Sequence, residues 1–422
     1  MDFDPWDAAF VADPYPAYRK LREQGRALWC EATGQWLIPH YADVSALLRD
    51  RRLGRTYLHR FSHEEFGRSA PPPEHEPFHV LNGNGLLDLE DPAHARVRRL
   101  VAKAFTPRTV ERLAPAVERL ARELTARFVA QGGGDLLTAV AEPLPVAVIA
   151  ELLGIPEADR APLRPWSADI CGMYELRPDP ETAARAVRAS LEFSAYLRDL
   201  IAERRGTPGP DLISALIAAH DDEGGGRLSE QEMISTCVLL LNAGHEATVN
   251  TTTNGWWALF RNPAALERLR SGGPEKLSTA VDELMRYDTP LQMFERWVLD
   301  DIRVGDTVIP RGAEVALLFG SANRDPARFE HPDELDLVRT DNPHLTFGAG
   351  IHYCLGAPLA RLELTASFGA LLDPAVPRLR LVSEPRWRDG YVIRGLRELL
   401  VECEGEPGAG QPAKPGTTRP DS

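Results

Sequence analysis

The spacing of apolar residues along the chain predicts a protein built mostly from helices. In long segments the apolar positions recur every three or four residues, which is the period of a helix with one buried face. The segments with this period are residues 15–24, 93–105, 109–131, 143–153, 181–205, 274–287 and 355–372. Residues 27–39 and 294–319 instead alternate around turn signals, which predicts a hairpin and a group of strands. We therefore expect a mainly α fold with a smaller β part.

One further helix is predicted to lie inside the protein. Ser229 followed by Glu232 has the spacing of a capping box, which marks the start of a helix. Residues 233–243 are then mostly apolar, and their few polar residues are small and uncharged. A helix that is apolar nearly all round is buried on all sides.

The chain shows no strong linker before residue 404. Residues 57–86 are rich in Pro, Gly, His and Glu and have no period, and a loop of this length is uncommon in a compact domain unless it has a function. Residues 404–422 lack apolar anchors, as disordered tails do. We expect a single domain over residues 1–403 and a disordered tail over residues 404–422.

The amino-acid composition disfavours some classes of binding partner. The chain has 48 Lys and Arg against 62 Asp and Glu, a formal net charge of −14, which disfavours nucleic acid and anionic membrane as partners. No stretch approaches the roughly 18 apolar residues of a membrane span, and the N-terminus has no signal-peptide pattern. The five cysteines are scattered, which is typical of a reducing compartment. These features predict a cytoplasmic protein.

The segment from Phe347 to Gly356 concentrates glycines around one cysteine, Cys354. A dinucleotide fingerprint is rejected, because Tyr353 occupies the place of its third glycine. Backbone N–H groups and the start of the following helix both favour a thiolate at Cys354. A lone thiolate suits an iron that needs one axial ligand from the protein, although an inert buried cysteine remains the simpler interpretation of Cys354 alone.

The whole string, FGAGIHYCLGAPLARLE, closely resembles the haem-binding signature of the cytochrome P-450 enzymes. The resemblance implies a cytochrome P-450 fold, a single domain that encloses one haem b (iron protoporphyrin IX). It implies that Cys354 is the metal ligand on the proximal side, within a loop that includes Gly348. It also implies that His352 binds a haem propionate and that Phe347 packs against the ring and shields the sulfur.

Two other motifs resemble the same family. Glu283 and Arg286 form an ExxR pattern, which alone predicts a solvated surface pair. The resemblance implies a buried structural pair, held together with a basic residue of the segment 323–339. The DPxHxxxR pattern places His94 and Arg98 on one helix face, and the resemblance puts them on the propionates together with Arg296 and His352. Burying two carboxylates without such cations would be costly.

The buried helix carries the sequence Ala243-Gly244-His245-Glu246-Ala247-Thr248. A glycine inside a helix costs about 1 kcal/mol relative to alanine, and a buried carboxylate costs more, which is expected at a functional site. The segment resembles the oxygen-binding helix of the family, where Ala243 and Gly244 would line the distal haem face. Gly244 would leave room for dioxygen, and Glu246 would relay protons through waters.

One position departs from the family pattern. Ala247 stands where the family usually has threonine, and Thr248 is turned about 100° around the helix, so it cannot simply substitute. We hypothesise that a substrate hydroxyl supplies the missing hydrogen bond during proton delivery. The alternative is that Ala247 reflects non-standard or poorly coupled chemistry.

The resemblance implies a monooxygenase that inserts one atom of dioxygen into a hydrophobic small molecule, by hydroxylation or epoxidation. The closest likeness is to actinobacterial biosynthetic members, which suggests a natural-product intermediate such as a polyketide or a modified peptide. Ferredoxin and a ferredoxin reductase, using NADPH or NADH, would supply electrons at a basic patch. The patch comprises Arg96, Arg98, Arg99, Lys103, Arg108 and Arg361.

The substrate pocket is expected to draw on several segments. These are the loop 57–86, the region 166–174, the turn 291–294 and residues 391–393, with Leu240, Ala243, Leu291, Met293, Phe294 and Val392 as named candidates. The alternatives for function are a haem-thiolate sensor or carrier, and an enzyme of this fold that uses peroxide or performs ring coupling, isomerisation or nitration.

Overall fold

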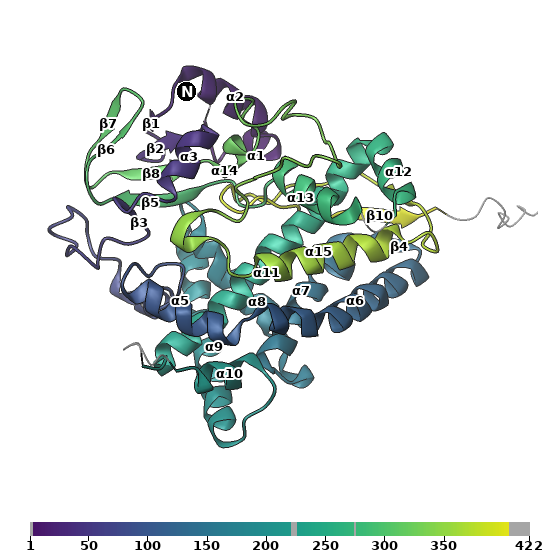
Figure 1. The fold of residues 1–422 in the computed structure, drawn as a ribbon, viewed down its shortest axis with the longest axis horizontal. Coiled ribbons are helices and arrows are strands. Elements are labelled where there is room, and N and C mark those ends of the chain that lie inside the picture. The colour runs from purple at the N-terminus through teal and green to yellow at the C-terminus, as the bar shows by residue number, and fades with distance from the viewer. Residues whose placement is uncertain (1–2, 221–225, 274–275, 405–422) are drawn as a thin grey trace, which may run out of the picture.

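A computed structural model describes residues 3–220, 226–273 and 276–404. The predicted mainly α fold with a smaller β part is confirmed (Figure 1). The longer helices are α2 (Tyr15–Gln24), α5 (Ala93–Ala104), α6 (Pro107–Ala130), α7 (Pro143–Leu153), α9 (Pro180–Gly206), α11 (Glu230–Arg261), α13 (Leu277–Tyr287) and α15 (Ala357–Leu372). The shorter ones are α1 (Ala8–Ala12), α3 (Tyr41–Leu47), α4 (Glu76–Gly83), α8 (Leu163–Cys171), α10 (Leu212–Ala218), α12 (Pro263–Ser271) and α14 (Phe319–Ala322).

The strands form three sheets. The largest has the order β1-β2-β8-β5-β3, from Leu28–Cys30, Gln35–Ile38, Glu314–Leu317, Phe294–Val298 and Leu53–Gly54. Strands β4 (Gly133–Asp135), β9 (Leu379–Leu381) and β10 (Leu400–Cys403) form a second sheet, and β6 (Ile302–Val304) and β7 (Thr307–Ile309) form a hairpin. The predicted hairpin over residues 27–39 and the strands over 294–319 are both present.

The large sheet has a different core on each face. Ile38, Val298 and Leu317 belong to one buried cluster, whereas Leu37, Met293 and Ala316 belong to another that includes the N-terminal helices. This division follows from the alternation of side chains along a strand. The sheet lies with α1–α3 at one side of the molecule, and the long helices fill the other (Figure 1).

Helix α11 runs through the helical half and contacts α7, α8, α9, α13 and α15. Its N-terminus is the predicted capping box, in which the Ser229 hydroxyl accepts from the amide of Glu232 and the Glu232 carboxylate accepts from the amide of Ser229. The helix continues from residue 230 to residue 261, so the segment 243–248 lies within one long buried helix.

The prediction that residues 57–86 form a loop is wrong in part. It contains α4, which starts with Glu76 and Pro77 in its first turn and buries Phe78 and Leu81. Only eight residues long, α4 is too short to show a clear helical period in the sequence. Residues 405–422 of the predicted tail lie outside the described residues. Glu404, the first residue of that predicted tail, is ordered by a hydrogen bond from its amide to the carbonyl of Arg378 at 2.7 Å.

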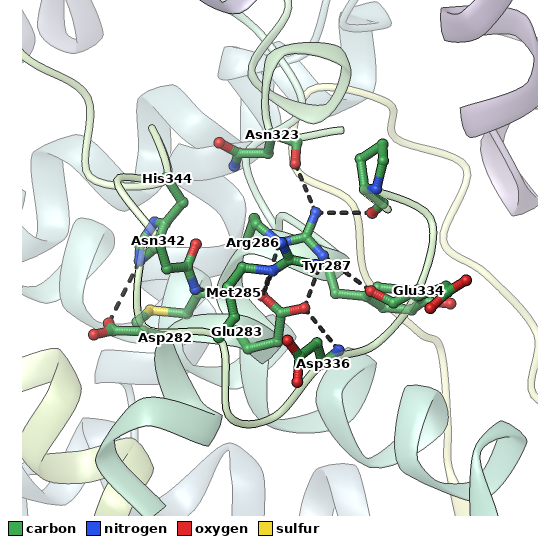
Figure 2. A network of polar contacts seen from close by, with 12 residues as sticks. Asp282, Glu283, Met285, Arg286, Tyr287, Asn323, Glu334, Asp336, Asn342 and His344 are labelled. Carbon is green, nitrogen blue, oxygen red and sulfur yellow. Dashed lines mark hydrogen bonds and ion pairs between the residues drawn. The ribbon is translucent and has the colours of Figure 1, made fainter. Parts of the chain in front are cut away.

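A buried ion pair joins α13 to the segment that precedes the cysteine loop (Figure 2). The Arg286 guanidinium donates to both carboxylate oxygens of Glu283, at 2.7 and 2.8 Å, and both side chains are fully buried. The Glu283 carboxylate also accepts from the amide of Asp336 at 2.9 Å and from Arg339 at 3.2 Å. The pair is therefore surrounded by partners that satisfy its remaining hydrogen-bonding groups.

Asn323 extends this network to the cysteine loop. Its carbonyl accepts from Arg286 at 2.8 Å, and its side-chain oxygen accepts from the amide of Leu345 at 2.7 Å. Its side-chain nitrogen donates to the hydroxyl of Thr346 at 3.1 Å. Because Phe347 follows directly, the ion pair fixes the place where the cysteine loop begins.

The substitution Glu283→Ala is expected to lower the free energy of unfolding by about 3–5 kcal/mol, because it leaves two arginines without their buried partner. Urea denaturation followed by circular dichroism measures this. The matched control is Glu267→Ala, which breaks a pair with Arg378 whose side chains are 54% and 58% exposed, and it should cost less than about 1 kcal/mol. Equal losses in the two variants would contradict the structural role of Glu283.

Candidate functional site

The site is a cavity of about 1090 Å³ between the large sheet, α11 and the cysteine loop. Single ligands occupy pockets of roughly 300–1,000 Å³, so this cavity is large enough for a cofactor together with a substrate. Among its lining residues are the expected candidates Leu240, Ala243, Gly244, Glu246, Ala247, Thr248, Leu291, Met293, Phe294, Arg296, Phe347, Gly348, His352, Cys354, Arg98 and Val392. The structure thus brings together segments that are more than 250 residues apart in the chain.

The cysteine loop depends on two glycines with left-handed backbone angles. Gly348 and Gly350 have φ values of 68° and 72°. A Cβ atom at Gly350 would lie 2.3 Å from the carbonyl oxygen of Leu48, so a side chain there would collide with the backbone after α3. The loop closes where the amide of Cys354 donates to the carbonyl of Phe347 at 3.0 Å. The Cys354 sulfur is thereby held just before α15.

The surroundings of the Cys354 sulfur act on its charge in two directions. Burial raises the pKa of the thiol, whereas the amides of Gly356 and Ala357 and the positive charge of Arg98 lower it. Burial has the larger effect, and the amide donors act in the expected direction by favouring the thiolate. A bound metal cation would supply the positive charge that stabilises the thiolate.

A group of basic side chains faces the cavity near the cysteine loop. Arg296 is 3% exposed, and among the described residues its one hydrogen bond goes to the carbonyl of Glu295 at 2.8 Å. The rings of His94 and His352 lie 4.5 Å apart. Burial lowers the pKa of His94 to about 4 and that of Arg296 to about 9. Each of these groups therefore lies where a nearby negative charge would stabilise its protonated form.

The same basic group contains hydrogen-bonding atoms without partners. Among the described residues, the Nε2 atoms of His94 and His352 are buried and accept or donate no hydrogen bond. Within the described part of the chain, the Nε2 atom of His352 forms no hydrogen bond but has one charged neighbour, a carboxylate oxygen of Glu90 at 3.5 Å. Arg98, Arg296 and His352 line the cavity, whereas His94 packs behind His352. This donor set fits the two propionates of the expected haem.

Glu246 and Gly244, in the expected oxygen-binding turn of α11, each contact another segment of the chain. The carboxylate of Glu246 is bound by Arg388 at 2.9 Å and by the side chain of Asn250 at 3.3 Å. A Cβ atom at Gly244 would lie 3.1 Å from Cδ1 of Ile149, so this glycine also lets α11 pack closely on α7. The pairing of Glu246 with Arg388 joins residues 142 positions apart and has no local sequence signal.

Glu363 is a site residue that the sequence interpretation did not single out. It belongs to α15, lines the cavity and is 1% exposed. Burial raises the pKa of its carboxyl group to about 8, and the neighbouring side chain of Thr248 lowers that pKa by a smaller amount. Its Oε1 atom has no partner among the described residues. The signal was an acidic residue among the apolar residues of the helix after Cys354, within the same string.

The structure corrects the expected pocket and patch in several places. Trp166 stacks on Phe193 and does not line the cavity, and Gln292 is buried against Tyr18. In the basic patch, Arg96 pairs with Glu232 and Arg361 pairs with Asp282. Arg99, Lys103 and Arg108 are exposed on α5 and at the start of α6, and the ammonium group of Lys103 donates to the carbonyl of His220 at 2.7 Å.

No helix within the described ranges has the length and apolar character required to cross a membrane.

Comparison with known proteins gives consistent results. The family described as Cytochrome P-450 matches residues 167–272 and 275–374. The chain is 39% identical to cytochrome P-450 107B1 of Saccharopolyspora erythraea over 95% of this chain and 97% of that protein. It is 38% identical to the cytochrome P-450 monooxygenase PikC of Streptomyces venezuelae, over 95% and 94% of the two chains. The solved structure of the Bacillus subtilis polyketide synthase cytochrome P-450 PksS superposes with a TM-score of 0.85, 35% identity and coverage of 96% and 100%.

The buried carboxyl group of Glu363 predicts a dependence of stability on pH. Its pKa is about 8 in the folded protein against an ordinary value of 4.5, so between these values the folded state binds the extra proton. Stability from this group is therefore lost as the pH rises through that window, at up to about 1.4 kcal/mol per pH unit. Relative to Glu363→Gln, the wild type should lose free energy of unfolding between about pH 5 and pH 8.

Urea denaturation at several pH values tests this prediction. The control is Glu74→Gln at an exposed residue, which should follow the wild type. Parallel pH profiles for the wild type and Glu363→Gln would show that Glu363 does not titrate as proposed.

Proposed function

The chain belongs to the cytochrome P-450 family, and we propose that it is a monooxygenase that hydroxylates or epoxidises a hydrophobic natural-product intermediate. The family and its fold bind haem b, and the enzyme is an oxidoreductase that incorporates oxygen from dioxygen. The observation that carries the proposal is the convergence of Cys354, the basic group and the buried turn of α11 on one cavity. PikC is a monooxygenase, and PksS belongs to a polyketide synthase, which supports a polyketide-like substrate.

The residues around the cavity divide the work of holding the haem. Cys354 would be the axial ligand of the iron, and Phe347 would shield its sulfur. His94, Arg98, Arg296 and His352 would bind the propionates, whose negative charge would add to that of Glu90 beside this basic group. When bound, the haem activates dioxygen with two electrons and two protons and transfers one oxygen atom to the substrate.

Proton delivery would use the side chains on the α11 face of the cavity. Glu246 is held by Arg388, which is partly exposed and thus connects the carboxylate to solvent. Ala247 has no hydroxyl, so a hydroxyl of the substrate would complete the hydrogen-bonded route. Glu363 holds a proton at neutral pH beside the hydroxyl of Thr248, which provides a second donor at the cavity wall.

Electrons would come from ferredoxin and its reductase, with NADPH or NADH as the donor. The exposed cations Arg99, Lys103 and Arg108 support docking of an acidic partner near the cysteine loop. The absence of an apolar membrane-spanning helix in the described ranges, together with unpaired cysteines there, supports a cytoplasmic location.

A second candidate function rests on Ala247. Without the usual threonine, the same fold could serve as a haem-thiolate sensor or carrier, or perform peroxide-driven oxidation, ring coupling, isomerisation or nitration. The retained Glu246 and the Thr248–Glu363 pair favour oxygen activation, because a carrier needs no proton donor. Incubation with dioxygen, NADPH, ferredoxin and its reductase separates the two, since a sensor yields no oxygenated product.

The Soret band of the reduced protein with bound carbon monoxide tests the iron ligand. The wild type should show the red-shifted band of thiolate ligation, and Cys354→Ala should lose it, because this sulfur is the expected axial ligand. The control Cys403→Ala removes a partly exposed thiol in β10 and should keep the band. An unshifted band in the wild type, or a retained band in Cys354→Ala, would refute the assignment.

The substitution Ala247→Thr tests substrate-assisted proton delivery. With a substrate found through its spin-state shift, the wild type should form product, whereas an analogue without the assisting hydroxyl should consume electrons with little product. Ala247→Thr should raise the product formed from the analogue per NADPH consumed, because the added hydroxyl replaces that of the substrate. Efficient turnover of the analogue by the wild type, with no change in the variant, would contradict the hypothesis.

A further inference from the structure

We propose that Gln35, Glu295 and Glu314 form a binding site for a cationic amine in the cavity wall, so that the substrate carries an ammonium group at a distance from the oxidised position. We call these three residues the acidic subsite. The inference deepens the proposed function and rests on it, since it concerns the substrate of that reaction.

The acidic subsite is built by three neighbouring strands of the large sheet, β2, β8 and β5. Trp297 pairs with Glu314, and Glu295 lies two residues before Trp297, so these side chains share one face of the sheet. Gln35 and Glu314 each precede a paired residue of the parallel strands β2 and β8, which places them side by side. All three subsite residues line the cavity. The side chain of Arg296, between Glu295 and Trp297, lies on the other face of the sheet, where it belongs to the basic group near the cysteine loop.

The subsite has hydrogen-bond acceptors that the protein does not satisfy. The side-chain nitrogen of Gln35 donates to Glu295 at 2.8 Å, which fixes the orientation of the amide because a carboxylate only accepts. The Oε1 atom of Gln35 is then buried without a partner among the described residues, and Gln35 is 3% exposed. A buried acceptor without a donor is costly, so this atom indicates a missing ligand.

The two carboxylates also lack a counter-charge. Within the described part of the chain, neither Glu295 nor Glu314 forms an ion pair. Burial and the neighbouring charge of Glu295 raise the pKa of Glu314 to about 7, which is consistent with two acidic groups that share too little positive charge.

The nearest arginines are engaged elsewhere. Arg55 pairs with Asp88 at 3.1 Å and donates to the carbonyl of Glu295 at 3.1 Å. Arg68 donates to the carbonyl of Gly312 at 2.9 Å and lies over the ring of Trp297. Both contribute only at longer range to Glu314. The positive charge that the acidic subsite requires must therefore come from a ligand.

The chemistry of the subsite selects an ammonium group. Its three groups offer acceptors, and an ammonium or protonated tertiary amine supplies both positive charge and N–H donors. A carboxylate would be repelled, and a neutral hydroxyl would leave the charges uncompensated. Among the described residues no group of three or more acidic, His or Cys side chains is arranged to bind a metal ion, which disfavours a cation site of that kind.

Calorimetric titration of the haem-loaded protein with three probes of equal chain length tests the proposal. The probes are decyldimethylammonium, decan-1-ol and decanoate, below their micelle-forming concentrations and at neutral pH, where the tertiary amine is protonated. The protonated amine carries the N–H donor that the acceptor of Gln35 lacks, and its nitrogen has no free lone pair to ligate the iron. Decyldimethylammonium should bind about tenfold more tightly than decan-1-ol, and decanoate should bind more weakly than either.

Matched variants assign the effect to the acidic subsite. The double variant Glu295→Gln, Glu314→Gln keeps the shape of both side chains and should weaken the binding of decyldimethylammonium about tenfold while leaving that of decan-1-ol unchanged. The control Glu384→Gln, at an exposed residue outside the cavity, should bind all three probes as the wild type does. The carbon monoxide spectrum shows that each variant holds its haem.

The outcomes for the subsite and for the proposed function are distinct. Equal affinities for the three probes, or an ammonium preference that survives in the double variant, would overturn the acidic subsite even if the enzyme oxygenates a substrate. An ammonium preference that the double variant abolishes would support it even if no oxygenated product formed, because probe binding requires no turnover.

Discussion

The proximal half of the molecule depends on the buried ion pair between Glu283 and Arg286. Two charges removed from water are tolerated only when their remaining lone pairs and N–H groups are satisfied at the same time. The partners come from Asp336, Arg339 and Asn323, so the meander after the sheet must adopt one path to supply them. Asn323 also hydrogen-bonds Leu345 and Thr346, so the cysteine loop, which follows them, starts from a fixed position.

The cavity wall favours ligand groups of opposite charge at two places. Near the cysteine loop, burial lowers the pKa values of His94 and Arg296, so these groups favour an anion. On the opposite face of the sheet, burial raises the pKa of Glu314 on β8, so the acidic subsite favours a cation. The haem propionates would supply the anion at the first place. The acidic subsite has no ion-pair partner among the described residues, so it is the more informative of the two for the choice of substrate.

Local patterns in the sequence predicted most of the long helices and the strands, but they missed short helices such as α4 and could not show which residues contact one another. The capping box gave the start of α11, alternation gave the strands of residues 294–319, and the cysteine string gave the family. The pairing of Glu246 with Arg388 could not be predicted, because it depends on how the C-terminal segment folds over α11. Glu363 was visible in the string, yet its raised pKa follows from burial, which a sequence pattern does not report.

Strand β5 carries Arg296 and Glu295 as consecutive residues on opposite faces. One short, fully paired strand would thus hold a contact to the cofactor and a contact to the substrate, and their spacing is set by covalent geometry. A substrate bound through its amine would then place next to the iron the carbon whose distance from the amine equals the distance from the acidic subsite to the iron. Regioselectivity would become a matter of molecular length, and lengthening or shortening the linker between amine and carbon skeleton would move the oxidised position along the chain.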